Sequence, residues 1–139
     1  MAADEEETVE GDGDRNSREL LHKDLTSEII GAAFEVHRVL GHGFLEGVYK
    51  LALQAELCRR GITAEVEHPI DVYYKNIIVG FYKADLLVAN AVIVELKIAK
   101  TYCAADEAQL LNELKATGVR VGLLINFGQR KVEFKRLVL

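Results

Sequence analysis

The pattern of hydrophobic residues predicts a helix at the start of the ordered part of the chain. Its apolar side chains recur every three or four positions and so share one helical face; they are Leu25, Ile29, Ala33, Val36 and Leu40. We expect Asp24 or Thr26 to cap the start of this helix. Gly41 and Gly43, which bracket His42, break the pattern and end it.

Two further helices are predicted from the same spacing. One covers residues 45–60 and is followed by Gly61, the position at which glycine commonly ends a helix. The other covers residues 105–117 and is ended in the same way by Gly118. Its inward-facing side chains are predicted to be Ala108, Leu111 and Leu114.

Between the second and third helices the hydrophobic period changes to two, which is typical of β-strands. We expect Pro69 to open this region, Lys75-Asn76 to form a turn, and Ala89-Asn90-Ala91 to close a tight hairpin. Strands are predicted over residues 70–74, 77–81, 86–88, 92–94, 119–126 and 131–138.

This order of helices and strands predicts an α/β fold with a central mixed β-sheet flanked by helices. The 139 residues suit one domain, which we place at residues 19–139. Residues 1–18 are interpreted as a disordered acidic tail, because residues 1–17 carry seven acids and one base and few apolar side chains. The remainder holds 15 acids and 16 bases, so any binding of nucleic acid has to be local.

The composition also bears on cellular location. No apolar run reaches the roughly 20 residues that span a bilayer, and the N-terminus lacks the order of charges of a signal peptide. We therefore expect no membrane association and an intracellular, cytoplasmic protein. Cys58 and Cys103 lie far apart in the sequence and are predicted to be reduced and buried.

Three charged residues interrupt the apolar hairpin. Glu95 and Lys97 end its second strand and, two residues apart, share one face at a spacing of roughly 6–7 Å. Asp85 precedes the apolar run of its first strand. If the loop has three residues, Val88 faces Val92. Asp85 then falls opposite Glu95, with Cβ atoms about 5 Å apart. A two-residue loop would put Asp85 on the other face of the sheet.

Two carboxylates at this distance repel each other, and a hard divalent cation is the simplest compensation. Mg²⁺ accepts one or two carboxylates and keeps several waters, which leaves room for a phosphate oxygen. Lys97 could orient or help to deprotonate the attacking water, or stabilise charge on phosphorus. The alternative is an exposed Glu95–Lys97 salt bridge, with Asp85 at a strand edge. Three charges that converge within an apolar hairpin favour the metal site.

The motifs resemble those of a known group of enzymes. Asp85, nine intervening residues and then Glu95-Leu96-Lys97 resemble the motif of the PD-(D/E)XK nuclease superfamily. The segment Gly43-Phe44-Leu45-Glu46-Gly47-Val48-Tyr49 is similar to the signature of the GxxExxY family within that superfamily. The similarity covers nearly all of residues 20–139. His42 stands where that family usually has proline, and Glu113 where tyrosine is common.

The resemblance implies a restriction-endonuclease-like core and a Mg²⁺- or Mn²⁺-dependent nuclease that hydrolyses phosphodiester bonds in DNA or RNA. It implies that Asp85 and Glu95 are the main metal ligands, that Glu46 joins them, and that Lys97 is the catalytic lysine. Gln109 resembles a position that often supports such sites. The alternative function is a catalytically inactive module of the same fold that binds nucleic acid or a protein partner.

The residues alone leave several roles open. Glu46 also fits the start of a helix and a surface pair with Lys50. Tyr49 could hydrogen-bond a ligand or phosphate, or pack inside the helix face. Gln109 is of a type that is usually exposed. A homodimer, formed through an edge strand or the first helix, is a further expectation that no residue of the sequence demonstrates.

Overall fold

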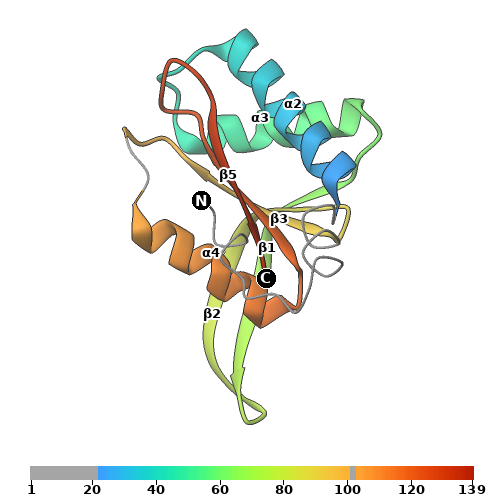
Figure 1. The fold of residues 1–139 in the computed structure, drawn as a ribbon, viewed down its shortest axis with the longest axis vertical. Helices are drawn as coiled ribbons and strands as arrows, with labels where there is room; N and C mark the ends of the chain where they lie inside the picture. Colours follow the sequence, from blue (N-terminus) through green and yellow to red (C-terminus); the bar gives the residue numbers. More distant parts are fainter. Residues whose placement is uncertain (1–21, 101–102) are drawn as a thin grey trace, which may run out of the picture.

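The computed structural model describes residues 22–100 and 103–139 (Figure 1). The predicted acidic tail, residues 1–18, lies outside the described residues. In chain order the elements are α2 (Lys23–Leu40), α3 (Glu46–Arg59), β1 (Ala64–Tyr74), β2 (Ile77–Val88), β3 (Val92–Lys97), α4 (Ala104–Thr117), β4 (Val121–Asn126) and β5 (Glu133–Val138). The predicted order of two helices, several strands, a helix and two strands is confirmed, but the strands predicted over residues 77–81 and 86–88 are one continuous strand, β2.

The strands form one mixed sheet in the order β1-β2-β3-β4-β5. Strands β3 and β4 are parallel and are joined by the crossover helix α4, whereas every other neighbouring pair is antiparallel. Helices α2 and α3 cover one face of the sheet and α4 covers the other, as their buried contacts show (Figure 1). The prediction of an α/β fold with a mixed sheet between helices is therefore confirmed.

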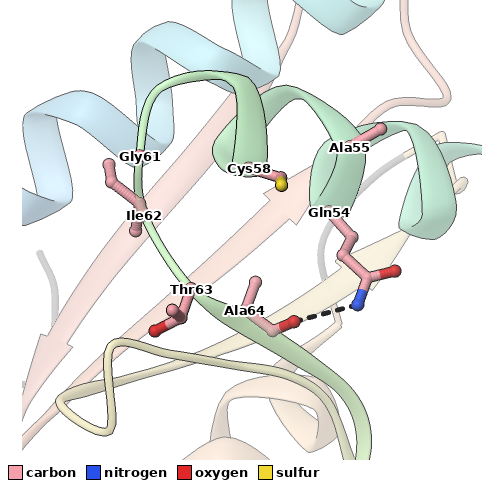
Figure 2. Close-up of a pocket in the computed structure, with 7 residues that line it drawn as sticks. All are labelled: Gln54, Ala55, Cys58, Gly61, Ile62, Thr63 and Ala64. Atoms are coloured by element: carbon pink, nitrogen blue, oxygen red, sulfur yellow. Dashed lines mark hydrogen bonds between the residues drawn. The ribbon is translucent and has the colours of Figure 1, made fainter.

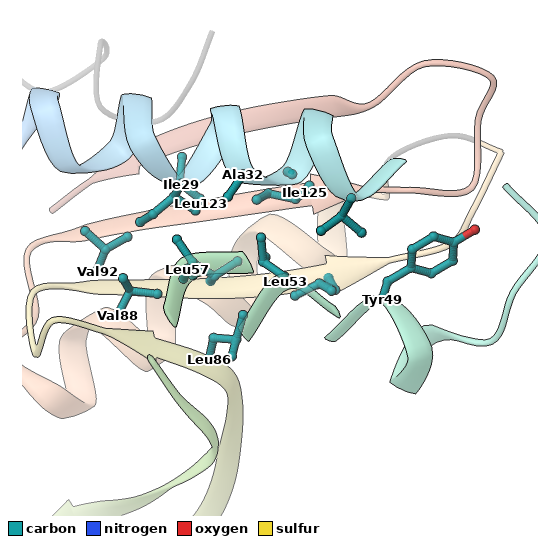
Figure 3. Close-up of a cluster of buried hydrophobic side chains, with 14 of the residues drawn as sticks. Ile29, Ala32, Tyr49, Leu53, Leu57, Leu86, Val88, Val92, Leu123 and Ile125 are labelled. Atoms are coloured by element: carbon teal, nitrogen blue, oxygen red, sulfur yellow. The ribbon is translucent and has the colours of Figure 1, made fainter. Parts of the chain in front are cut away.

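The main core lies between the sheet and the pair α2–α3 (Figure 3). It includes Ile29, Ala32, Leu53, Leu57, Leu86, Val88, Val92, Leu123 and Ile125. A second cluster packs Leu110 and Leu114 of α4 against Ile93 and Leu124 on the opposite face. Because β3 is buried on both faces, its sequence is apolar without alternation until Glu95.

Two predicted details of the element ends are wrong. Strand β1 begins at Ala64, so Pro69 lies inside a strand rather than at its start. This is tolerated because β1 is an edge strand, the part of a sheet in which proline is found. Helix α2 begins after His22 in a left-handed conformation and has no side-chain cap. The Thr26 hydroxyl donates instead to the carbonyl oxygen of Lys23 at 3.0 Å.

The inward face of α4 also differs from the prediction. Leu114 is buried as predicted, but Ala108 is exposed and Leu111 only half-buried. The buried positions are instead Leu110, Glu113 and Leu114. The helix is thus rotated relative to the predicted stripe, and a carboxylate faces the sheet.

Both cysteines are free thiols, as predicted, but both are exposed, so their predicted burial is wrong. Cys58 lies on the outer side of α3 and lines an apolar pocket of about 630 Å³ between the end of α3 and the start of β1 (Figure 2). The Gln54 side chain in this pocket donates to the Ala64 carbonyl oxygen at 2.9 Å. No helix within residues 22–100 and 103–139 is both long and apolar enough to cross a membrane.

A buried amide anchors the segment that follows β3. Asn126 is fully buried, accepts the N–H of Ala99 at 3.1 Å and donates to the Ala99 carbonyl oxygen at 2.7 Å. The Phe127 N–H donates to the carbonyl oxygen of Lys97 at 2.8 Å. The Gly128 N–H closes the arrangement by donating to Asn126 Oδ1 at 2.8 Å. These bonds fix the end of the strand that carries Lys97.

Gly128 provides a test of this anchoring. A Cβ atom at this position would lie 2.6 Å from the backbone carbon of Ile98, which cannot move as a flexible side chain would. We expect Gly128→Ala to lower the free energy of unfolding by roughly 1–3 kcal/mol, measured by urea denaturation. The matched variant Gly47→Ala, in a helix with no atom close to the new methyl group, should not lower it. Equal stabilities for the two variants would contradict the close approach.

Candidate functional site

Asp85 and Glu95 lie opposite each other at the point where β2 and β3 separate. The ladder pairs Val88 with Val92, as the three-residue loop predicts, and continues for two more pairs. At the next position, where Asp85 lies opposite Glu95, side-chain carboxylates accept the backbone N–H groups in place of backbone carbonyls. The Asp85 N–H donates to Glu95 Oε2 at 3.2 Å, and the Leu96 N–H donates to Asp85 Oδ2 at 2.8 Å. Each carboxylate is thereby held against the strand that carries the other.

The backbone is also distorted on the other side of Asp85. Glu67, at the matching position of β1, has a φ of 53°, and the regular pairing of β1 with β2 skips this position. Lys50 of α3 reaches both residues: its Nζ lies 3.2 Å from Glu67 Oε2 and 3.5 Å from Asp85 Oδ1. Irregular strand positions of this kind are common next to functional sites. An ammonium group thus contacts the carboxylate predicted to bind metal.

Glu46 is the first residue of α3 and is half-buried. Burial and then the negative charge of Asp85 raise its pKa, and the ammonium groups of Lys97 and Lys50 offset part of this rise. The structure therefore brings Glu46 into the electrostatic environment of Asp85. A carboxylate at the start of a helix and a carboxylate on β2 meet although they are far apart in the sequence.

Glu95 is almost completely buried, with 5% of its surface exposed. Burial, followed by the neighbouring carboxyl groups of Glu113 and Asp85, raises the pKa of Glu95 to about 10. Glu113 on α4 is fully buried, within hydrogen-bonding reach of Glu95, and its Oε2 accepts from Gln109 Nε2 at 3.0 Å. Its Oε1 is buried, and no donor among the described residues reaches it. Gln109 therefore reaches the site through Glu113.

Lys97 lies at the end of β3, and its Nζ is 3.3 Å from Asp106 Oδ1 in the first turn of α4. Burial lowers the pKa of Lys97, but the negative charge and hydrogen bond of Asp106, together with the charge of Glu46, outweigh burial and raise it overall. Lys97 is accordingly held as an ammonium ion. Of the roles considered for it, this charge favours stabilisation of negative charge over the acceptance of a proton.

Tyr49 is buried at one end of the main core (Figure 3). Its ring stacks on Phe127 with centroids 4.8 Å apart. Its hydroxyl donates to the Gly41 carbonyl oxygen at 2.6 Å and accepts from the Phe44 N–H at 3.3 Å. Tyr49 therefore fastens the loop that leads into Glu46, and its polar atom is engaged by backbone groups.

The donor set suits a hard divalent cation, because Glu46, Asp85 and Glu95 offer carboxylate oxygens, and the charge of Asp85 helps to raise the pKa values of both Glu46 and Glu95. Within residues 22–100 and 103–139, however, no group of three or more His, Cys, Asp or Glu side chains is already arranged to hold a metal ion. Lys50 and the Leu96 N–H engage the two oxygens of Asp85. The residues fit a cation in their chemistry, and cation binding competes with these contacts.

The family model of the PD-(D/E)XK nuclease superfamily matches residues 23–137. The chain belongs to the PD-(D/E)XK nuclease superfamily. PD-(D/E)XK nucleases typically use divalent metal ions, which agrees with the oxygen-rich donor set. No curated protein sequence matches the chain.

A solved structure is similar to this chain in fold. The crystal structure of SSO0001 is similar to this chain with a TM-score of 0.51 and 16% sequence identity. The similarity covers 87% of this chain and 61% of that chain, so this chain spans less than two thirds of SSO0001. At this identity the likeness concerns the fold, and the predicted restriction-endonuclease-like core is confirmed.

Sequence reasoning missed several residues around the PD-(D/E)XK motif, namely Lys50, Glu67, Asp106 and Glu113. The hairpin pattern contains none of them, because they come from α3, β1 and α4. A signal existed for Glu113. It shares helical spacing with Leu110 and Leu114, so a buried stripe drawn through those leucines includes it. No spacing in the sequence indicates that Lys50 reaches β1 and β2.

The burial of Glu95 predicts a pH-dependent stability. The folded chain keeps a proton on Glu95 that the unfolded chain releases above its ordinary pKa of 4.5. Without metal, the free energy of unfolding should therefore fall as pH rises from this value towards 10. Glu95→Gln removes this loss. The free energy of unfolding of the variant minus that of the wild type should therefore increase by about 1–3 kcal/mol between about pH 5 and about pH 8, measured by urea denaturation in EDTA. The same difference at both pH values would show that Glu95 is ionised in the fold.

Proposed function

We propose that this protein is a Mg²⁺- or Mn²⁺-dependent nuclease that hydrolyses phosphodiester bonds in DNA or RNA, and that it falls within the GxxExxY group of the superfamily. The proposal rests on one observation in a member of the PD-(D/E)XK superfamily. The carboxylates of Asp85 and Glu95 each accept a backbone N–H from the opposite strand, β3 or β2. The segment of residues 43–49, which leads into Glu46, supports the finer assignment.

Asp85, Glu95 and Glu46 are the residues proposed to hold the cation. When bound, a divalent cation neutralises negative charge on the phosphodiester and favours ionisation of the attacking water. The chain prepares for this by keeping three carboxylates together at an energetic cost, which is visible in the raised pKa values of Glu46 and Glu95. A bound cation would offset the repulsion between Asp85 and these two groups, which favours cation binding at this position.

Lys97 is proposed to stabilise the negative charge that develops on the phosphate. Its ammonium group is held beside Asp106 at 3.3 Å and near the negative charge of Glu46, so it is charged before substrate arrives. An ammonium that is already positioned needs little reorganisation when charge appears on the phosphoryl oxygens. Asp106 acts as a positioning residue for Lys97 and Gln109 as a supporting residue through Glu113.

The nuclease assignment predicts a metal-dependent cleavage activity that depends on Lys97. We expect cleavage of single-stranded, double-stranded or branched DNA or RNA with Mg²⁺ or Mn²⁺. Lys97→Ala should reduce its rate by on the order of 10²–10³-fold. Lys115→Ala is the matched control, because Lys115 is exposed in the last turn of α4 and lies outside the cluster. The measurement is initial cleavage rate on labelled substrates, with and without EDTA.

Two outcomes of this assay would contradict the proposal. One is the absence of metal-dependent cleavage by the wild type on every substrate class. The other is an equal rate for Lys97→Ala and Lys115→Ala, which would trace the cleavage to a contaminating enzyme or to a different site.

Metal binding is tested separately by stability. A cation that binds only the folded chain at about 100 times its Kd raises the free energy of unfolding by about 2.7 kcal/mol. We expect Mn²⁺ to stabilise the wild type in this way and Asp85→Asn to remove most of the gain. Asp71→Asn, at an exposed position of β1, should retain it. A gain of the same size in both variants would place the cation away from Asp85.

A further inference from the structure

Glu113 is a buried carboxylate with one oxygen that accepts a hydrogen bond and one that does not. Its side chain, on the inward face of α4, is fully buried. Gln109 Nε2 donates to Oε2 at 3.0 Å, whereas Oε1 is buried and no hydrogen-bond donor within residues 22–100 and 103–139 reaches it. A buried carboxylate is costly unless donors or positive charge surround it. Oε1 of Glu113 therefore requires a partner that the described side chains do not supply.

The packing of α4 on the sheet places Glu113 against Glu95. Ile93 of β3 is buried in one cluster with Leu110 and Leu114 of α4. Because β3 pairs with β4 without a break over residues 92–97, Glu95 lies on the same side of the strand as Ile93. Glu113 precedes Leu114 on the buried face of α4 and is within hydrogen-bonding reach of Glu95. The contact between the two side chains thus follows from the packing of the helix.

These two side chains complete a row of three acidic groups. Glu95 Oε2 accepts the N–H of Asp85 at 3.2 Å, so the row runs from β2 across β3 to α4. Ionised carboxylates are acceptors only and cannot hydrogen-bond to each other. Hard divalent cations take carboxylate oxygens as ligands and offset the repulsion between them. A row of acidic groups that ends in a buried oxygen without a donor is therefore suited to a cation.

The two lysines of the site already have carboxylate partners. Lys97 Nζ lies 3.3 Å from Asp106 Oδ1. Lys50 Nζ lies 3.2 Å from Glu67 Oε2 and 3.5 Å from Asp85 Oδ1. A cation from solution can bring positive charge to Glu113 without breaking either set of ion pairs.

Glu113 differs from Asp85 in what it gives up when it binds a cation. Asp85 Oδ1 contacts Lys50, and Oδ2 accepts the N–H of Leu96 at 2.8 Å. A cation at Asp85 has to share or displace these contacts. Oε1 of Glu113 has no contact with a described donor to lose, and Gln109 holds the other oxygen in place. Ligating carboxylates are commonly oriented by such a second hydrogen bond.

We propose that Glu113 is a further ligand of the divalent cation, which it approaches through Oε1 from the α4 side of Glu95. Gln109 is then the residue that orients this ligand. Because it concerns the same cation, this proposal rests on the proposed function. It adds α4 to the elements that supply ligands, so that the cation joins the helical layers on both faces of the sheet.

Isothermal titration of the full chain with Mn²⁺, after removal of metal by EDTA and dialysis, tests this assignment. Glu113→Gln keeps the size of the side chain and an acceptor for Gln109, but it removes the carboxylate oxygen. We expect it to raise the Kd for Mn²⁺ by roughly 10–100-fold. Glu107→Gln is the matched control, because Glu107 is a part-buried glutamate of α4 that pairs with Lys135 at 2.8 Å. Its Kd for Mn²⁺ should equal that of the wild type.

Glu113→Asp separates a ligand from a distant charge. This variant keeps the negative charge but withdraws the carboxylate by one methylene group. A ligand that is withdrawn binds the cation less well, so we expect the Kd for Mn²⁺ to rise by roughly tenfold. A wild-type Kd in Glu113→Asp, with a raised Kd in Glu113→Gln, would show that Glu113 acts through its charge alone and would overturn the proposal.

Urea denaturation in EDTA separates metal binding from folding. In the metal-free chain the amide N–H of Glu113→Gln can donate to Glu95, so its urea midpoint should be no lower than that of the wild type. The upward shift of the midpoint on addition of Mn²⁺ should be smaller than in the wild type. A fall of both the midpoint in EDTA and the affinity for Mn²⁺ would assign Glu113 a structural role. Circular dichroism verifies that each variant is folded, and Glu113→Asp provides the comparison if Glu113→Gln is not.

The titration also distinguishes this proposal from the proposed function. A wild type that binds Mn²⁺, with the same Kd in Glu113→Gln, overturns the role of Glu113 and leaves the metal-dependent nuclease intact. A wild type that binds no Mn²⁺ overturns the metal-dependent function, and the role of Glu113 with it.

Discussion

The constraint on which the site depends is the placement of a carboxylate, Glu95, in a strand that is buried on both faces. Strand β3 lies at the centre of the sheet, between β2 and β4, with helices on either side. A carboxylate in such a strand needs hydrogen-bond donors or a cation. The Asp85 N–H is one donor, and it is free to donate because β2 separates from β3 at this position.

Several features of the neighbouring elements follow from this separation. Asp85 accepts the N–H of Leu96, which would otherwise be left unpaired where the ladder ends. Lys50 contacts the other oxygen of Asp85 and also Glu67, where the backbone of β1 is distorted. The sheet therefore opens where its charged groups collect. The same opening frees the outer half of β2 to continue with β1 as a hairpin that projects beyond the helices (Figure 1).

The two helical layers contribute different parts of the site. Helix α3 brings Glu46 and Lys50 to Asp85, while α4 brings Asp106 to Lys97 and Glu113 to Glu95. The site lies where both layers meet the end of β3, and the Asn126 hydrogen bonds hold the segment after this strand in place. Burial of Glu46 and Glu95, followed by repulsion from neighbouring carboxylates, is the main electrostatic cost of this arrangement. A divalent cation would offset that cost, which links the architecture to the metal use typical of the superfamily.

The sequence by itself determined the order of the elements and the hairpin register, because hydrophobic period and turn chemistry are local properties of the chain. Val88 faces Val92 as the three-residue loop requires, and this register brings Asp85 to Glu95. Only the tertiary structure decided which side of α4 packs inward and hence that Glu113 joins Glu95. Both stripes of α4 have helical spacing, and the choice between them is made by contact with the sheet. The contacts of Lys50 and Asp106, and the exposure of the β1–β2 hairpin, likewise arise from packing between elements distant in the sequence, which no local pattern encodes.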